Sequence, residues 1–251
     1  MALNFIRFCF PGVPNVECAF QTRVGGASSG PYAKGNVSLM VGDAPEAAAA
    51  NRAALAAELG LEAVAELQQV HGDRLIFEPG PQTFLRADTL PSVEGDGLAS
   101  SRSGLGLLIK TADCQPLFFA HESGRAVAAL HVGWRGNRIN FPAGGLRAFC
   151  AHYGCAPREV LAVRGPSLGP AAAEFVNFES EWGDAYAPWF DAQRRTMDLW
   201  RLTRGLLEEA GMAPERIFSL DLCTASLPQF FSYRRDKPTG RQANLIWRVQ
   251  G

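Results

Sequence analysis

Short apolar segments, each bounded by glycine, proline or aspartate, restrict the fold of this sequence more than any other feature. We predict strands from them at residues 65–69, 105–110, 117–120, 126–131, 160–164, 217–220 and 245–249. Segments of this length with such boundaries are typical of buried strands. They alternate only irregularly with helical segments, which favours mixed α+β layers over a regular doubly wound fold.

Three helices are predicted between these strands. The first covers residues 47–57, where Pro45 suits the first turn and Gly60 can end the helix. The second covers residues 197–210, in which leucines recur at helical spacing, and a less regular third covers residues 145–153.

The 251-residue chain is long enough for one large domain or two small ones, and no repeat, linker or shift in composition marks a boundary. We therefore predict a single α+β domain over residues 1–251, a layered arrangement of mixed sheets flanked by helices. The N-terminal residues do not resemble a secretory signal, and no stretch reaches the roughly 18 apolar residues of a membrane helix. We expect a cytoplasmic protein that uses no membrane.

Charge limits the possible partners of the protein, and cysteine usage indicates its redox compartment. Lys plus Arg is 24 and Asp plus Glu is 25, so there is no basic excess of the kind that nucleic-acid binding requires. The six cysteines are scattered without any CxxC pair, as expected of free thiols in a reducing compartment.

Three segments place a potential metal ligand at the end of a strand-like run. They are QQVHG with His71, TADCQP with Cys114 and HVGWRG with His131. Imidazole and thiolate are both good ligands of Zn²⁺, and three of them leave a fourth position for water or substrate. Asp113, beside Cys114, is a candidate for orienting a ligand or carrying a proton.

The same residues allow two other interpretations. Cys114 could act as a nucleophile with His131 as its base, as in a Cys–His hydrolase. Alternatively, both histidines and the cysteine could serve only packing and hydrogen bonding. Their separations match no local metal motif, so the spacing leaves these alternatives open.

Two other segments carry groups suited to an anion. Arg23 lies among glycines that permit tight turns, and its planar guanidinium could bind phosphate or carboxylate. Arg234 and Arg235 follow aromatic residues near the C-terminus and could bind an anionic or planar group. An ordinary surface loop explains the Arg23 segment equally well, and a run such as the one around Arg234 and Arg235 is more often an ordinary strand with a solvated end.

In order along nearly the whole chain, the segments TRVGG, QVHG, TADC, HVGWRG and SYRRDKPTGRQANLIW resemble the YfiH-like family, also called the laccase-domain or polyphenol-oxidase-like family. The resemblance implies a layered α+β fold and a zinc site formed by His71, Cys114 and His131. It also implies phosphorolysis of adenosine, inosine and methylthioadenosine, together with deamination of adenosine, so that a nucleoside and phosphate are the partners.

The resemblance suggests roles for further residues. Arg23, Asn36 and Arg135 are candidates for binding substrate, by residue type and by their place in the family motifs. Cys114 and Asp113 are the candidates for catalysis. The usual signature of zinc deaminases, H-x-E with P-C-x-x-C, is absent, so deamination would need a different arrangement of residues.

Two other activities are connected with the family. One is copper-dependent oxidation of polyphenols, and the other is correction of misbuilt peptidoglycan precursors, which a Cys–His hydrolase could perform. A multicopper laccase requires more imidazole ligands than the four histidines of this chain, His71, His121, His131 and His152. Single-site zinc chemistry is therefore favoured, and copper would be an adventitious occupant of the same site. A third alternative, a module that keeps the fold without catalysis, is disfavoured because the set of metal ligands is intact.

Overall fold

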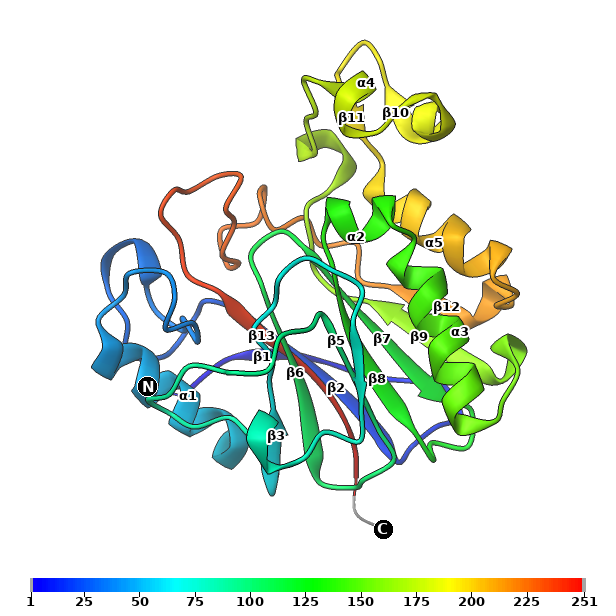
Figure 1. Cartoon of the computed structure of the whole chain (residues 1–251). Coiled ribbons are helices and arrows are strands. Elements are labelled where there is room, and N and C mark those ends of the chain that lie inside the picture. The colour runs from blue at the N-terminus through cyan, green and yellow to red at the C-terminus, as the bar shows by residue number, and fades with distance from the viewer. Residues whose placement is uncertain (1, 250–251) are drawn as a thin grey trace.

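Two β-sheets pack face to face between two layers of helices in the computed structural model, which describes residues 2–249 (Figure 1). The first sheet has the order β1-β2-β13-β6-β3, with strands Phe5–Cys9, Val16–Gln21, Gln242–Arg248, Leu105–Thr111 and Ala63–Ala65. The second has the order β12-β9-β7-β8-β5-β4, with strands Ile217–Ser219, Val160–Arg164, Gln115–His121, Val127–Val132, Gly97–Ser100 and Leu75–Phe77. Both are mixed sheets, because β3–β6, β4–β5 and β9–β12 pair in parallel and the other pairs are antiparallel.

The facing surfaces of the sheets enclose the largest apolar core. Phe20 of β2 stacks on Phe118 of β7 with ring centroids 5.2 Å apart, and both side chains are fully buried. Alternate residues of β6, such as Leu107 and Ile109, enter the same core, as the two-residue period of a strand requires. Sheet-on-sheet packing thus explains why the inner faces of the central strands are apolar.

Helices cover the outer face of each sheet (Figure 1). On the first sheet lies α1 (Pro45–Leu59), which ends at Gly60 in the left-handed conformation with φ 67°. On the second lie α3 (Phe141–Tyr153) and α5 (Leu199–Glu209), with the short α2 (Trp134–Arg138) at one end of the sheet. These layers confirm the predicted α+β class and the three predicted helices.

A segment that includes α4 (Phe178–Glu181) and the hairpin of β10 (Phe190–Asp191) and β11 (Thr196–Met197) projects beyond this body, above α2 (Figure 1). It has an aromatic core of its own, in which Phe175 and Trp182 pack on Trp134 of α2. Short 3-10 helices occur at Gly30–Tyr32, Pro81–Thr83, Pro157–Glu159, Pro170–Ala172, Asp184–Trp189 and Pro214–Arg216.

The predicted strands agree with those of the structure to different degrees. Those at 105–110, 117–120, 126–131, 160–164, 217–220 and 245–249 overlap β6, β7, β8, β9, β12 and β13. The prediction of a continuous strand over 65–69 is wrong beyond its first residue, because β3 ends at Ala65 and Gln68 then forms only an isolated bridge with Glu94. Strands β1, β2, β4, β5, β10 and β11 were not predicted. Within residues 2–249 no helix is long and apolar enough to cross a bilayer.

Candidate functional site

The side chains of His71, Cys114 and His131 converge at one end of the second sheet. Their ligand atoms all lie within 4.8 Å of one another, and within residues 2–249 no other group of three His, Cys, Asp or Glu side chains is arranged this way. The two imidazole rings are 4.7 Å apart, and the thiol sulfur of Cys114 lies 3.9 Å from Nε2 of His71.

Strand pairing brings the cysteine and one histidine together. His131 is in β8, while Cys114 directly precedes β7, which pairs antiparallel with β8 so that Gln115 lies opposite Val132. The sequence places both ligands at strand ends, and the register puts those ends side by side. His131 is buried, Cys114 is partly exposed and His71 is exposed, so the group opens to solvent on one side.

Asp96 connects the third ligand to the other two. Its carboxylate accepts hydrogen bonds from the backbone N–H groups of Val70 (3.2 Å), His71 (2.9 Å) and Gly72 (2.7 Å), and so fixes the loop that carries His71. Within that loop His71 adopts a φ of 62°, which turns the chain sharply. Gln69 adds a second anchor, because its amide both donates to and accepts from the backbone of Lys110.

The same carboxylate orients His131. Nδ1 of His131 lies 2.7 Å from Oδ1 of Asp96, and both side chains are buried. A hydrogen bond at Nδ1 leaves Nε2 as the nitrogen that is available to a metal or to Cys114. Burial alone would raise the pKa of Asp96, but His131 and the amides of Gly72 and Val70 outweigh it and lower that pKa.

Asp96 was not among the residues predicted for the site. Its only signal in the sequence is a carboxylate between two glycines in front of a strand, which many turns share.

Electrostatic coupling prepares Cys114 to act as a thiolate. Burial opposes ionisation of this thiol, yet the neighbouring His131 and His71 bring its pKa down to about 6. Conversely, burial disfavours protonated His131, while Cys114 and Asp96 raise its pKa to about 9. In the absence of a metal, the pair therefore carries a thiolate beside an imidazolium.

Gly133 leaves space beside the ligands. A Cβ at this position would lie 3.0 Å from Sγ of Cys114 and 3.2 Å from Cδ2 of His71. Since the φ of Gly133 is −79°, the backbone itself would tolerate a side chain, but a Cβ would crowd Cys114 and His71. Two imidazoles and a thiolate, with no side chain on Gly133 beside them, fit a borderline-soft ion such as Zn²⁺.

The Asp113 carboxylate is directed to the C-terminal segment. Its Oδ1 accepts from the hydroxyl of Thr224 at 2.7 Å, and its Oδ2 accepts from the backbone N–H of Arg234 at 2.6 Å. Both oxygens thus hold that segment beside the metal group, by which we mean the side chains of His71, Cys114 and His131.

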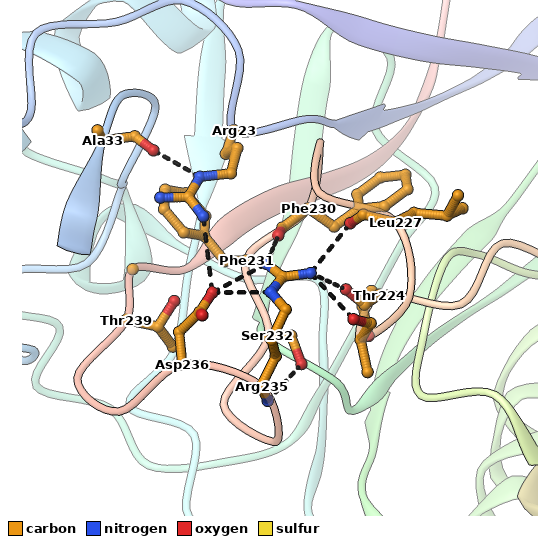
Figure 2. A network of polar contacts seen from close by, with 12 residues as sticks. Arg23, Ala33, Thr224, Leu227, Phe230, Phe231, Ser232, Arg235, Asp236 and Thr239 are labelled. Atoms are coloured by element: carbon orange, nitrogen blue, oxygen red, sulfur yellow. Dashed lines mark hydrogen bonds and ion pairs between the residues drawn. The ribbon is translucent and has the colours of Figure 1, made fainter. Parts of the chain in front are cut away.

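Arg23 is bound into a network of protein groups (Figure 2). Its Nε donates to the carbonyl of Ala33 at 2.6 Å, its Nη1 lies 3.7 Å from Asp236, and its guanidinium lies over the ring of Phe231. Arg235 completes the network, since it also pairs with Asp236 and donates to several backbone carbonyls.

Asn36 is fully buried, and its side-chain amide is fully hydrogen-bonded. Nδ2 donates to Ser38 and Asp43, while Oδ1 accepts from the backbone N–H groups of Ser38 and Arg241. The structure therefore brings neither Arg23 nor Asn36 to the metal group as a free ligand-binding group.

Arg135 differs from these two residues. It is exposed at the start of α2, two residues after Gly133, and its guanidinium lies 4.5 Å from the ring centroid of Trp134. Among residues 2–249 it has no hydrogen-bond or ion-pair partner for its side chain.

The remaining two histidines lie outside the metal group. Nδ1 of His121 lies 2.9 Å from the hydroxyl of Ser123, and His152 stacks on Phe77 with ring centroids 4.1 Å apart. Two imidazoles and one thiolate are thus the complete set of soft ligands at the site within residues 2–249.

Comparison with known proteins identifies the family of the chain. Residues 17–249 match the family described as multi-copper polyphenol oxidoreductase laccase. A protein of Escherichia coli named purine nucleoside phosphorylase YfiH is 33% identical over 250 residues, which covers 96% of this chain and 97% of that one. A purine nucleoside phosphorylase of Pseudomonas aeruginosa is 35% identical over 247 residues, 95% of this chain and 96% of that one.

Solved structures show the same fold. The crystal structure of YlmD from Geobacillus stearothermophilus has a TM-score of 0.88 at 27% identity and covers 100% of this chain and 98% of that one. A hypothetical protein YfiH from Bacillus licheniformis has a TM-score of 0.82 at 26% identity, over 94% and 93% of the two chains. The chain therefore belongs to the YfiH family of laccase-domain proteins.

Proposed function

We propose that this protein is a zinc-dependent enzyme that cleaves purine nucleosides by phosphorolysis. The observation that carries the proposal is the convergence of His71, Cys114 and His131 around a space that Gly133 leaves open. The names of the curated relatives support the reaction class, since both cited relatives are called purine nucleoside phosphorylases.

The proposed substrates are adenosine, inosine and methylthioadenosine. In phosphorolysis an oxygen of phosphate forms a bond to C1′ of the ribose as the bond from C1′ to the purine nitrogen breaks. The purine leaves with the electron pair and takes up a proton, and the sugar leaves as its 1-phosphate. Adenosine deamination is proposed as a second activity, in which water replaces the amino group on C6 and ammonia departs.

A zinc ion held by these three side chains would supply a Lewis acid with one coordination position left for substrate or solvent. The protein's own contribution is positional. Asp96 fixes both the His71 loop and the tautomer of His131, and Asp113 holds the segment around Thr224 and Arg234 beside the site. Arg135 offers an exposed cation that lies over the ring of Trp134 and has no hydrogen-bond or ion-pair partner within residues 2–249.

Copper could occupy the same donors, because imidazole and thiolate also suit that metal. Multicopper oxidation needs a further set of imidazoles, and His121 and His152 lie elsewhere in contacts of their own. We therefore propose copper only as an adventitious occupant.

Replacement of one ligand tests the proposal. Purified wild type should retain close to one zinc per chain after dialysis and should cleave inosine only when phosphate is present. Cys114→Ala should lose both the metal and the activity, whereas Cys9→Ala, which removes an exposed cysteine on β1, should lose neither. Metal-free wild type together with full phosphorolysis by Cys114→Ala would refute the proposal.

One observation favours a second candidate, a Cys–His hydrolase that acts on peptidoglycan precursors. Without a metal, Cys114 has a pKa of about 6 and lies beside His131, an arrangement that activates a thiol nucleophile. Zinc that remains bound in stoichiometric amount through dialysis would count against this candidate, because it would occupy the nucleophile.

A further inference from the structure

Arg241 directly precedes β13 of the first sheet and lies near Cys114. Gln242, the first residue of β13, pairs with Thr111 at the end of β6. Continuing this antiparallel register places Arg241 beside Ala112, immediately before Asp113 and Cys114. A residue distant in sequence from every predicted ligand is thereby brought to the edge of the site.

The surrounding loop holds Arg241 firmly. Its backbone N–H donates to Oδ1 of the buried Asn36 at 2.9 Å, and its Nη1 donates to the carbonyls of Thr239 (3.1 Å) and Gly240 (2.9 Å). The glycine is needed there, because a Cβ on Gly240 would lie 2.8 Å from the ring of Phe231 and 2.9 Å from Asn36. Asn36 thus acts on the site indirectly, by positioning Arg241.

The half-buried Arg241 guanidinium has no ion-pair partner within residues 2–249, although Cys114 and Asp113 lie near it. Arg23, Arg52 and Arg164 are each paired with a carboxylate, of Asp236, Glu66 and Asp221 respectively. Arg241 has no carboxylate partner within residues 2–249, and its Nε and Nη2 have no hydrogen-bond acceptor there. Burial lowers the pKa of Arg241, while the nearby Cys114 and Asp113 oppose that shift.

Lys237 adds a second positive charge near Arg241, and both cations lie against the ring of Tyr233. The ring of Tyr233, which is 52% exposed, has the Arg241 guanidinium 5.9 Å from its centroid and the ammonium of Lys237 at 4.8 Å. Lys237 also has no carboxylate partner within the described residues. Two unpaired cations therefore meet on one exposed ring beside the candidate metal centre.

We propose that Arg241 binds the phosphate that attacks the nucleoside, with Lys237 at the rim of the same subsite. A partly buried guanidinium without an ion pair, and with N–H groups that lack acceptors, is unfavourable, and a phosphate in direct contact would supply both the paired charge and those acceptors. The inference rests on the proposed phosphorolysis. It also replaces the expectation that Arg23 binds phosphate, since Arg23 is already paired with Asp236.

Steady-state kinetics of the full-length, zinc-loaded protein test the assignment. With inosine saturating and phosphate varied, Arg241→Gln should raise KM for phosphate about tenfold to hundredfold, the effect of losing a charge-assisted hydrogen bond. KM for inosine and the zinc content should stay near the wild-type values. Arg241→Lys, which keeps the charge but loses the planar fork, should recover part of the loss.

Arg248→Gln is the matched control. Arg248 is also half-buried on β13 without a carboxylate partner, but it lies at the opposite end of the strand, where it donates to the carbonyls of Gly124 and Ser101. This variant should leave KM for phosphate unchanged. Melting temperatures of all three variants show whether the altered loop remains folded.

Direct binding of inorganic phosphate, measured by calorimetry, separates the two proposals. If the wild type binds phosphate and Arg241→Gln does not, the subsite stands even when no nucleoside is cleaved, and only the proposed function fails. If Arg241→Gln remains folded and binds phosphate as tightly as the wild type, the subsite is refuted. Equal losses in Arg241→Gln and Arg248→Gln would refute it as well.

Discussion

Asp96→Asn should weaken zinc binding although Asp96 would not touch the metal. The carboxylate accepts four hydrogen bonds: Oδ1 those of His71 N–H and His131 Nδ1, and Oδ2 those of Val70 and Gly72 N–H. An asparagine of the same shape has only one oxygen. In either orientation its NH₂ group would face two donors and leave both without an acceptor.

The size of the effect follows from these contacts. Loss of a group that orients a metal ligand costs 10–100-fold in metal affinity, or about 1.4–2.7 kcal/mol. Two unsatisfied donors at a buried position should also destabilise the metal-free protein by about 2–4 kcal/mol, which corresponds to a fall in Tm of roughly 5–15 °C.

Competition with a chromogenic chelator measures the zinc affinity, and calorimetry of the metal-free protein measures Tm. Asp43→Asn is the control, because Asp43 likewise accepts several hydrogen bonds, from Ser28, Asn36 and the N–H of Ala44. It should lose stability but keep wild-type zinc affinity. Zinc affinity in Asp96→Asn equal to that of the wild type, or reduced no more than in Asp43→Asn, would refute the reasoning.

Two other perturbations test the structure at separate points. Gly133→Ala should weaken zinc binding by about 1–3 kcal/mol, because the new methyl group would crowd Cys114 and His71. The control Gly144→Ala on α3, where a Cβ meets nothing within 4 Å, should leave zinc affinity unchanged. Equal zinc affinities of the two variants would show that the space beside Gly133 is not needed. Glu66→Gln should destabilise the protein at pH 7 by about 3–5 kcal/mol, because Glu66 is buried between Arg52 and Lys110. Burial opposes ionisation of Glu66, but these cations lower its pKa. The stability that ionised Glu66 contributes is therefore complete above its unfolded pKa near 4.5 and is lost as pH falls through its folded pKa. Unfolding free energies of wild type and variant should converge in acid, and a difference that stays constant with pH would contradict the assignment.

Local signals in the sequence predict the helices and the central strands. Pro45 and Gly60 mark α1 because their backbone preferences act within a single turn, without regard to tertiary context. Strand β5 shows the opposite case. It contains Gly97 and Ser100, and it is buried because it pairs with β4 and β8 while Leu75 and Phe141 lie against Gly97, which no local pattern reveals.

The convergence of Cys114 and His131 could be predicted because each lies at an end of an apolar strand, and those two strands are neighbours in one sheet. His71 joins them from a loop that Asp96 fixes, which the sequence does not reveal. The pairing of the arginines could not be predicted. Whether an arginine is free depends on a carboxylate distant in the sequence: Asp236 pairs with Arg23, and no carboxylate reaches Arg241. Arg23 and Arg241 both lie in glycine-containing motifs, so residue type and spacing alone do not distinguish them.

The most direct test of the central claim is the metal and phosphate dependence of inosine cleavage by the full-length protein. We expect zinc-loaded protein to release hypoxanthine and ribose 1-phosphate in equal amounts, only with phosphate present. Activity should disappear when chelation removes the metal bound by His71, Cys114 and His131, and return when one equivalent of zinc is restored. Cleavage that continues at the same rate in fully chelated protein would contradict the claim.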